Sequence, residues 1–507
     1  MREKSDTSYA TARLAQKAAK GGGITIVGNG LGRALSLGLH VLLARVLGSS
    51  SYGLYALGLG VIQLAKQVSI LGFNRGSMRF VSQYHGEADV QRVKGTIILS
   101  LSFPALASAV LGTLLFLSAN AISTGVFKEP SLAPVLRVLS LALPFFVITD
   151  IAVQCARGFQ RMGYYVGIGR VLRPAVHAIL VSFVFLLGHR LMGVTYALLL
   201  TAVVTAMIGL QGIRRMFPEG RSTRPIYETQ RLLRFSLTVL LLSLSQSFLS
   251  HTDKFMIGYF MTSAHVGVYS AAARAAKEQR LFIASLNAIF SPMVADLYNR
   301  NRLDELEELF KRVTRWAVTM TLPLFLMFVL FPAKIISIFG ADFVGGSSVL
   351  AVLCGAYLID VATGTVGALL VMTGRQKVEL LNVISTGVIN MGLNVWLIQR
   401  YGILGAAMGT GLSIAIVNIV KIVEVYKLLG IHPYDRKYLK PLIAGCMTIL
   451  LTRLLMTLEV MNSYWVVALL ACPIIYLIIV YVLGLEDEDV LLLKAAMSRL
   501  KSALKRR

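Results

Sequence analysis

Fourteen long apolar stretches constrain this chain more than any other feature. Each has between 19 and 28 residues, and an apolar helix needs about 20 residues to cross the hydrocarbon core of a bilayer. They lie at 24–46, 52–73, 95–118, 134–156, 165–187, 191–213, 233–258, 264–291, 315–333, 346–373, 378–399, 402–426, 438–459 and 463–484. The sequence therefore predicts an all-α integral membrane protein with about 14 transmembrane helices.

The composition agrees with this assignment. Only 15% of the 507 residues are charged, and the mean hydropathy is +0.70, whereas a soluble protein has about 25% charged residues. A soluble domain this apolar could not cover its own surface. The composition excludes a soluble enzyme and a disordered chain.

The distribution of positive charge orients the spans. The chain holds 50 Lys and Arg against 25 Asp and Glu. If the N-terminus is cytoplasmic, 34 of these cations fall in cytoplasmic loops or at the cytoplasmic ends of spans, four fall in outer loops and twelve fall deeper within spans. Cytoplasmic loops of membrane proteins carry such an excess. We therefore expect a multi-pass protein of the cell inner (cytoplasmic) membrane, with both termini cytoplasmic and no nucleic-acid partner.

Two halves of the chain share local patterns in the same order. Gly53-Leu-Tyr55-Ala56 aligns with Gly267-Val-Tyr269-Ser270 when the chain is shifted along itself. Gly158-Phe-Gln160-Arg161 aligns with Gly374-Arg-Gln376-Lys377 at nearly the same shift. These matches predict a duplicated six-helix unit, related by an axis along the membrane normal, as in transporters that work by alternating access.

The expected parts of the chain follow from the repeat. They are a cytoplasmic N-terminal segment (1–23), an N-lobe of six spans (24–213), a basic cytoplasmic linker (214–232), a C-lobe of six spans (233–426), two further spans (438–484) and a basic amphipathic cytoplasmic tail (485–507).

Cations inside spans are the first candidates for function, because a charge in the bilayer core is costly. Arg33 lies nine residues into the first span, about 14 Å deep at 1.5 Å per residue. An arginine stays charged and grips phosphate with two parallel N–H groups. The candidate substrate-binding residues of a cationic cleft are Arg33, Lys254, Arg274, Lys277 and Arg280. The alternative is pairing within the bundle, as between Arg274 and Glu278, four residues apart on a helix.

Two carboxylates within spans are candidates for ion coupling. Asp150 lies in the fourth span and Asp360 in the tenth. A carboxyl group in apolar surroundings can carry a proton, but it can equally be the partner of a cation in a neighbouring span. No sequence motif for a phosphate-binding loop, a zinc protease or a serine hydrolase occurs, and the four cysteines form no CxxC pair. We expect no catalytic residue, no metal and no cofactor.

Several local motifs resemble one known family. Span one ends in Leu43-Ala-Arg-Val-Leu-Gly48 and is followed by Tyr52-Gly-Leu-Tyr-Ala-Leu57. Span seven contains Asp253-Lys254 and is followed by Val266-Gly-Val-Tyr-Ser-Ala-Ala272. With Gly374-Arg-Gln376, these resemble the polysaccharide-transport (oligosaccharide and O-antigen flippase) branch of the multidrug/oligosaccharidyl-lipid/polysaccharide exporter superfamily, over about residues 20–485.

The resemblance implies a two-lobe bundle and a flippase. Such a protein moves a polyprenyl-diphosphate-linked oligosaccharide from the inner to the outer leaflet for cell-surface polysaccharide (O-antigen, lipopolysaccharide or exopolysaccharide) biosynthesis. Its partners would be that lipid-linked oligosaccharide, membrane lipids and a polysaccharide polymerase. A lipid II-type flippase is an alternative with the same cationic cavity. A multidrug exporter of the same superfamily is disfavoured because such exporters favour acids in the cavity. An enzyme such as a multi-span glycosyltransferase is disfavoured because the outer loops are short.

The alternating topology can be tested with reporter fusions. We expect an extracytoplasmic signal from fusions after residues 128, 189, 262, 340 and 461, because each position follows an odd-numbered span of a chain that starts in the cytoplasm. A cytoplasmic signal at any of these positions would contradict the count of fourteen spans.

Overall fold

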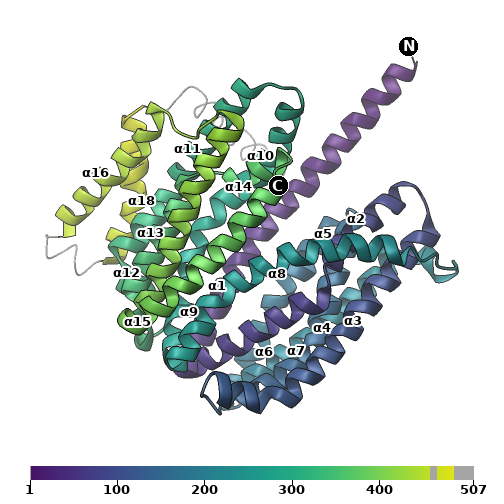
Figure 1. The fold of residues 1–507 in the computed structure, drawn as a ribbon, viewed down its shortest axis with the longest axis horizontal. Helices are drawn as coiled ribbons and strands as arrows, with labels where there is room; N and C mark the ends of the chain where they lie inside the picture. The colour runs from purple at the N-terminus through teal and green to yellow at the C-terminus, as the bar shows by residue number, and fades with distance from the viewer. Residues whose placement is uncertain (1, 457–464, 485–507) are drawn as a thin grey trace. The chain divides into compact units, whose positions relative to one another are not determined.

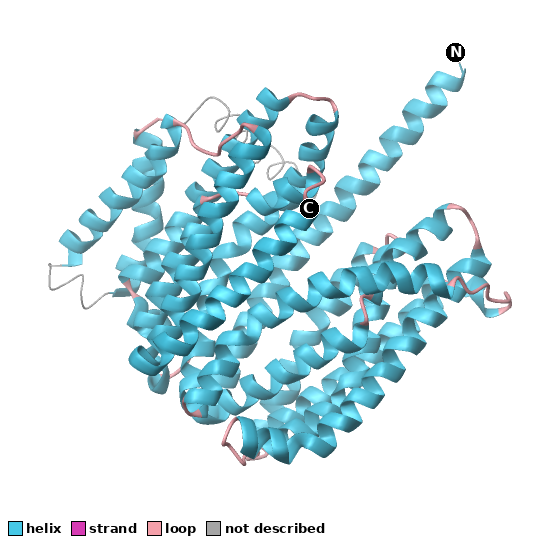
Figure 2. Ribbon diagram, viewed as in Figure 1, coloured by secondary structure: helices cyan, strands magenta, loops and turns pink. Residues whose placement is uncertain are grey.

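The computed structural model describes residues 2–456 and 465–484, and the side chains from residue 28 onward within these ranges apart from residues 221 and 242. Every regular element in the described residues is a helix, as Figure 2 shows. This confirms the all-α membrane fold predicted from the sequence. The amphipathic tail expected at residues 485–507 lies outside the described residues.

The number of spans in the structure agrees with the sequence. Twelve helical segments of the described chain are long and apolar enough to cross a bilayer. Two of them hold two spans each, because α1 (Arg2–Ile70) turns at Gly48 and α15 (Gln376–Leu429) turns at Gly402, both with positive φ. The described segments thus provide room for fourteen spans.

Both long helices fold back on themselves at these glycines. His40 Nδ1 and Tyr52 Oη are 3.1 Å apart although twelve residues separate them, a separation of about 18 Å in a straight helix. A Cβ built on Gly405 would lie 2.0 Å from the carbonyl oxygen of Leu397. Glycine is the residue that adopts such turns without a steric penalty.

The other helices are labelled in Figure 1. In the first half they are α2 (Phe73–Gly86), α3 (Val90–Asn120), η1 (Ala121–Val126), α4 (Leu132–Gly158), α5 (Met162–Val166), η2 (Gly167–Leu172), α6 (Arg173–Leu186), α7 (Leu191–Met216) and η3 (Pro218–Arg221). In the second half they are α8 (Thr229–Phe260), α9 (Ser263–Lys277), η4 (Glu278–Arg280), α10 (Leu281–Asn299), α11 (Leu303–Leu330), α12 (Pro332–Ser337), η5 (Ala341–Gly346), α13 (Ser347–Ala362), α14 (Val366–Met372), η6 (Arg436–Tyr438), α16 (Leu439–Met456) and α18 (Trp465–Val482).

Two of the expected spans are interrupted in the structure. The eighth span is α9 and α10, joined by the 3₁₀ turn η4. The tenth span is broken between α13 and α14 at Gly364, which has a φ of 76°. A Cβ on Gly364 would lie 2.1 Å from Thr314 Oγ1, so the break also brings two helices into close contact.

Packing divides the chain into two compact units. Unit 1 contains the residues up to Ala275 together with Ile336–Val349 and Val383–Gly409. Unit 2 contains Ala276–Ile335, Leu350–Asn382 and the residues from Thr410 onward. These units are groups of residues in contact and are not defined by internal repetition, so the division into an N-lobe (24–213) and a C-lobe (233–426) stays a prediction.

Each unit has its own apolar core. In unit 1, α4 is the most enclosed helix and runs beside α3 and α7 (Figure 1), with Leu139, Leu143 and Phe146 fully buried. In unit 2, α11, α16 and α18 share a core that includes Val318 and Tyr476. The last two spans thus pack on α11.

The segment that precedes α8 is held against the ends of α2 and α3. Lys94 Nζ donates a hydrogen bond of 2.7 Å to the carbonyl oxygen of Thr223, and the amide of Ile226 donates one of 3.1 Å to the carbonyl of Gln91. Glu228 accepts a short hydrogen bond from Tyr84 Oη, and its Oε1 lies 3.0 Å from Arg92 Nε. Residues 223–228 of the linker are therefore fixed against α2 and α3 by hydrogen bonds and an ion pair.

The Tyr84–Glu228 contact makes stability depend on pH. The hydrogen bond from Tyr84, with the nearby Arg231 and Arg92 guanidinium groups, lowers the pKa of Glu228. Burial, with the hydrogen bond to Glu228, raises the pKa of Tyr84 to about 12. A lowered carboxyl pKa stabilises the fold above the unfolded value of about 4.3 and loses this effect as the pH falls. A raised tyrosine pKa stabilises it below about 10 and loses this effect as the pH rises.

We expect Glu228→Gln to lower the thermal unfolding midpoint of the purified protein at pH 7. The difference from the wild type should shrink below about pH 4, where the wild-type carboxyl group also becomes protonated. Glu308→Gln is the matched control, because Glu308 is exposed and paired with Arg312 one helical turn away. Such exposed pairs contribute about 0–1 kcal/mol. An equal effect of both variants at pH 7 would contradict the assignment.

Candidate functional site

Two glycines let α1 and α9 touch backbone to backbone. A Cβ built on Gly53 would lie 1.7 Å from the carbonyl oxygen of Ser263, and one built on Gly267 would lie 2.0 Å from the carbonyl oxygen of Ser49. Ser50 Oγ and Ser263 Oγ are 3.2 Å apart across the same contact. We call these residues the glycine seam. Any side chain at either glycine would force the helices apart.

The glycine seam joins positions that the sequence pairs as repeats. The shift that aligns the two halves carries Ser49 to Ser263 and Gly53 to Gly267, and the two contacts are reciprocal. Reciprocal contact between equivalent positions is what a twofold axis requires. The sequence identified these positions as similar but gave no signal that they touch.

Two loop segments reinforce the seam from both halves of the chain. Ser263 donates its amide to Glu129 Oε1 at 2.9 Å, close to the ring contact between Phe127 and Phe255. In the other half, Arg45 Nε donates to the carbonyl oxygen of Ile338 at 2.8 Å, close to the edge contact between Tyr52 and Phe343. All of these residues belong to unit 1. The turn of α1 at Gly48 is therefore flanked by contacts from both halves of the chain.

Three of the five predicted cations gather along one stretch of α1. Arg274 donates a short hydrogen bond from Nη2 to Ser36 Oγ, one helical turn from Arg33. His40, one turn further, is close enough to Arg274 and Lys254 to interact with their charges. We call Arg33, Lys254 and Arg274 the cationic cluster.

Two arginines of the cationic cluster are short of acceptors. Arg33 is half-buried and has no hydrogen bond or ion pair within the described part of the chain. Arg274 Nε is buried without a partner among the described residues. Guanidinium groups without acceptors in a span predict an anion or water as the missing partner.

The other two predicted cations lie in unit 2 and are placed differently. Arg280 is the last residue of the 3₁₀ turn η4, forms an ion pair of 3.0 Å between its Nε and Asp360 Oδ2, and faces the Tyr357 ring. Lys277 is exposed at the end of α9. The structure thus does not bring all five cations into one site within either unit, and their common cleft stays a prediction.

Both predicted coupling carboxylates are partners of cations. Asp150 on α4 lies 2.7 Å from Lys66 Nζ and 3.7 Å from Arg173 Nη1. Asp360 on α13 accepts a hydrogen bond of 3.3 Å from Asn418 in addition to its pair with Arg280. This is the structural alternative that the sequence left open. A role in ion coupling stays a prediction for both.

A third carboxylate, Asp253, has a different environment that the sequence did not single out for coupling. Its oxygens accept hydrogen bonds from Tyr269 Oη at 2.5 Å, Asn394 Nδ2 at 2.8 Å and Asn390 Nδ2 at 3.2 Å. Both asparagines are almost fully buried, and Asn394 Oδ1 has no partner among the described residues. Carboxylate and amide oxygens in apolar surroundings can hold a proton or a hard cation. The sequence pattern that could have indicated this environment is the pair Asn390 and Asn394, two asparagines four residues apart inside an apolar span.

Comparisons with known proteins agree with this fold. The family model described as polysaccharide biosynthesis protein matches residues 18–298, more than half of the chain, and the MatE model matches residues 239–396. The probable low-salt glycan biosynthesis flippase Agl15 of Haloferax volcanii is 29% identical over 223 residues, which cover 44% of this chain and 46% of that relative. The uncharacterized membrane protein MJ1068 of Methanocaldococcus jannaschii is 19% identical over 93% of this chain and 95% of its own length.

Solved structures share the architecture at low sequence identity. The lipid II flippase MurJ in an inward closed conformation has a TM-score of 0.73 at 13% identity, covering 90% of this chain and 98% of MurJ. An inward-facing multidrug resistance MATE transporter has a TM-score of 0.64 at 18% identity, covering 80% and 98%. These likenesses define the class of the fold, which is that of the multidrug/oligosaccharidyl-lipid/polysaccharide exporter superfamily.

Within that class, the chain belongs to the polysaccharide biosynthesis protein family, the polysaccharide branch of the superfamily. This confirms the resemblance drawn from the motifs around spans one, two, seven and eight. The matching families and solved neighbours are transporters.

The glycine seam can be tested by cross-linking. We expect Ser50→Cys/Ser263→Cys to form a disulfide readily in membranes, because the two Oγ atoms are 3.2 Å apart. After cleavage at a protease site inserted in the linker near residue 222, the halves should stay together on a denaturing gel until a reductant is added. Ser51→Cys/Ser263→Cys is the control, since position 51 faces another direction on the helix. Equal cross-linking of both pairs would contradict the geometry.

Proposed function

We propose that the protein is a flippase that translocates polyprenyl-diphosphate-linked oligosaccharide units across the cytoplasmic membrane by alternating access. It would supply cell-surface polysaccharide biosynthesis, with the lipid-linked oligosaccharide as substrate and a polysaccharide polymerase as a downstream partner. The cationic cluster is the single observation that carries this proposal.

The cluster needs an anion for energetic reasons. A lone cation at the bilayer centre costs about 2.5–3.5 kcal/mol even on the lenient insertion scale. A diphosphate supplies two anionic groups with several acceptor oxygens, which suit the N–H groups of Arg33 and Arg274.

Family membership supports the sugar-linked substrate over the alternatives. Matched relatives include a probable glycan biosynthesis flippase. A lipid II-type substrate has the same diphosphate, so the cluster itself suits both, and the family match favours the oligosaccharide. A multidrug exporter is disfavoured because the described charges on this stretch of α1 are cations.

Alternating access gives the glycine seam a role. With the N-terminus in the cytoplasm, the turn at Gly48 lies at the outer face, so the closed seam would belong to an inward-facing state. Opening toward the outside would require α1 and α9 to separate at Gly53 and Gly267. The absence of side chains at both positions lets the seam close again without trapping a gap.

Coupling ions would act at the half-buried carboxylates of the spans. Asp150 and Asp360 remain candidates, and their release from Lys66 or Arg280 would accompany a conformational change. Asp253 is the better candidate on geometry, because it accepts hydrogen bonds from the amide groups of two almost fully buried asparagines, Asn390 and Asn394.

The decisive experiment is transport of a fluorescent polyprenyl-diphosphate oligosaccharide in proteoliposomes. Arg33→Ala should reduce the translocation rate at least tenfold, because Arg33 has no other described partner and its loss removes a phosphate contact. Arg33→Lys should restore only part of the rate, since lysine lacks the planar fork. Arg137→Ala is the matched control, because Arg137 is a span arginine that is exposed and lies 6.0 Å from the Phe116 ring.

Protein level and thermal midpoint must be equal in all three variants. Normal transport by Arg33→Ala would overturn the cationic mechanism. Transport that continues at full rate in the oxidised Ser50→Cys/Ser263→Cys protein would separately overturn the alternating opening of the seam.

A further inference from the structure

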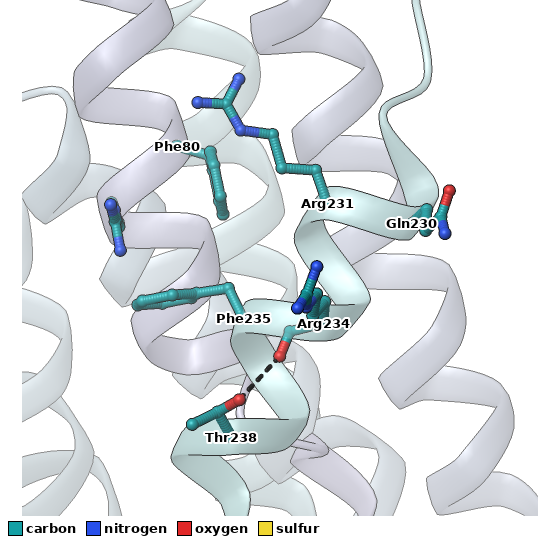
Figure 3. Close-up of a pocket in the computed structure, with 7 residues that line it drawn as sticks. Phe80, Gln230, Arg231, Arg234, Phe235 and Thr238 are labelled. Atoms are coloured by element: carbon teal, nitrogen blue, oxygen red, sulfur yellow. Dashed lines mark hydrogen bonds between the residues drawn. The ribbon is translucent and has the colours of Figure 1, made fainter.

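A second cationic site lies in unit 1, away from the cationic cluster. α2 and the first turns of α8 border an open cavity of about 550 Å³ (Figure 3). Three arginines line it, Arg79 from α2 and Arg231 and Arg234 from α8, together with Phe80 and Phe235. No acidic residue lines this cavity within the described chain.

The arginines are oriented by aromatic rings. The guanidinium carbon of Arg79 lies 4.5 Å from the centre of the Phe235 ring, and that of Arg231 lies 5.5 Å from the centre of the Phe80 ring. Stacking on a ring stabilises a guanidinium and leaves its N–H edge available for an acceptor.

The charge of the cavity is not neutralised by the described residues. Arg231 pairs with Glu228 at 3.2 Å, and Glu228 is shared with Tyr84 and Arg92. Arg79 and Arg234 have no side-chain hydrogen bond or ion pair in the same part of the chain. At least two guanidinium groups thus face the cavity without an anion.

The surroundings of the cavity point to a lipid. Arg234 lies at the start of the seventh span, and Leu237 and Leu241 follow it on the same side of α8 at three and seven residues. These leucines are 47% and 66% exposed. A cationic cavity continuous with an exposed apolar helix face matches a molecule with a phosphate headgroup and acyl chains.

We propose that this cavity binds the phosphate headgroup of an anionic phospholipid, with the acyl chains lying along α8. The charge distribution of the loops places it at the cytoplasmic leaflet, where anionic lipids attract basic segments. The lipid would bridge α2 to α8, two helices that also meet where Gly72 and Gly76 approach Ser236. This proposal does not depend on the transported substrate.

The test uses the full-length protein in a neutral detergent, titrated with phosphatidylglycerol and followed by native mass spectrometry. The wild type should bind one lipid tightly, and Arg79→Gln/Arg234→Gln should bind it about tenfold more weakly or worse, a change equal to about 1.4 kcal/mol. Arg300→Gln/Arg302→Gln is the control. It removes the same two charges from exposed arginines that pair with Asp296 and Glu305.

The outcomes separate the sources of the phosphate. Equal lipid affinity in the wild type and Arg79→Gln/Arg234→Gln overturns the proposal, and so does an equal loss in the control. Inorganic phosphate that displaces phosphatidylglycerol at similar concentration would assign a soluble anion to the cavity and overturn the lipid. If an equimolar polyprenyl diphosphate displaces phosphatidylglycerol, and excess phosphatidylglycerol does not reverse this, the cavity belongs to the transported substrate and the lipid proposal is overturned. An unchanged thermal midpoint without lipid shows that the double variant is folded.

Discussion

The contact between Gly53 and Gly267 is the constraint on which the arrangement of unit 1 depends. Side chains in a bilayer gain little from burial against one another, because lipid is as apolar as they are. Close packing therefore has to provide the attraction, and the absence of Cβ atoms allows it here. At the seam the carbonyl oxygens of Ser49 and Ser263 occupy the space that a side chain would need.

The cost of placing charges in the spans is the second constraint on the fold. The span cations fall into two groups, those paired with a carboxylate and those without one. Lys66, Arg280 and Lys421 each lie within 3.0 Å of a carboxylate. Arg33 and Arg274 instead lack such a partner among the described residues. Since the fold pairs these three span cations so closely, the two arginines without a carboxylate support the proposed anion site.

The sequence predicted the number of spans because hydropathy is local. It also identified Asp150, Asp360 and the five cations as charges in spans. The partners of charged residues could not be predicted, because they come from distant parts of the sequence. Asp253, for example, accepts hydrogen bonds from Asn390 and Asn394, which lie 137 and 141 residues further along the chain. The break at Gly364 was missed for the same reason, since its cause is the approach of Thr314 on another helix. The arginine cavity between α2 and α8 likewise depends on two segments that lie far apart in the sequence.

The seam and the cationic cluster are carried by the same two helices. Ser36 lies eleven residues before the end of the first arm of α1 at Leu47, and Arg274 lies eleven residues after the start of α9 at Ser263. At 1.5 Å per residue both are about 17 Å below the turn, near the middle of a bilayer core about 30 Å thick. Ser36 and Arg274 therefore lie at the same depth in the membrane, and Gly53 and Gly267 lie closer to the turn at Gly48. A movement that separates α1 from α9 at the glycines also acts on the contact between Ser36 and Arg274. In the proposed mechanism, an anion bound at Arg274 would compete with Ser36 for its N–H groups, so binding and opening would share one set of contacts.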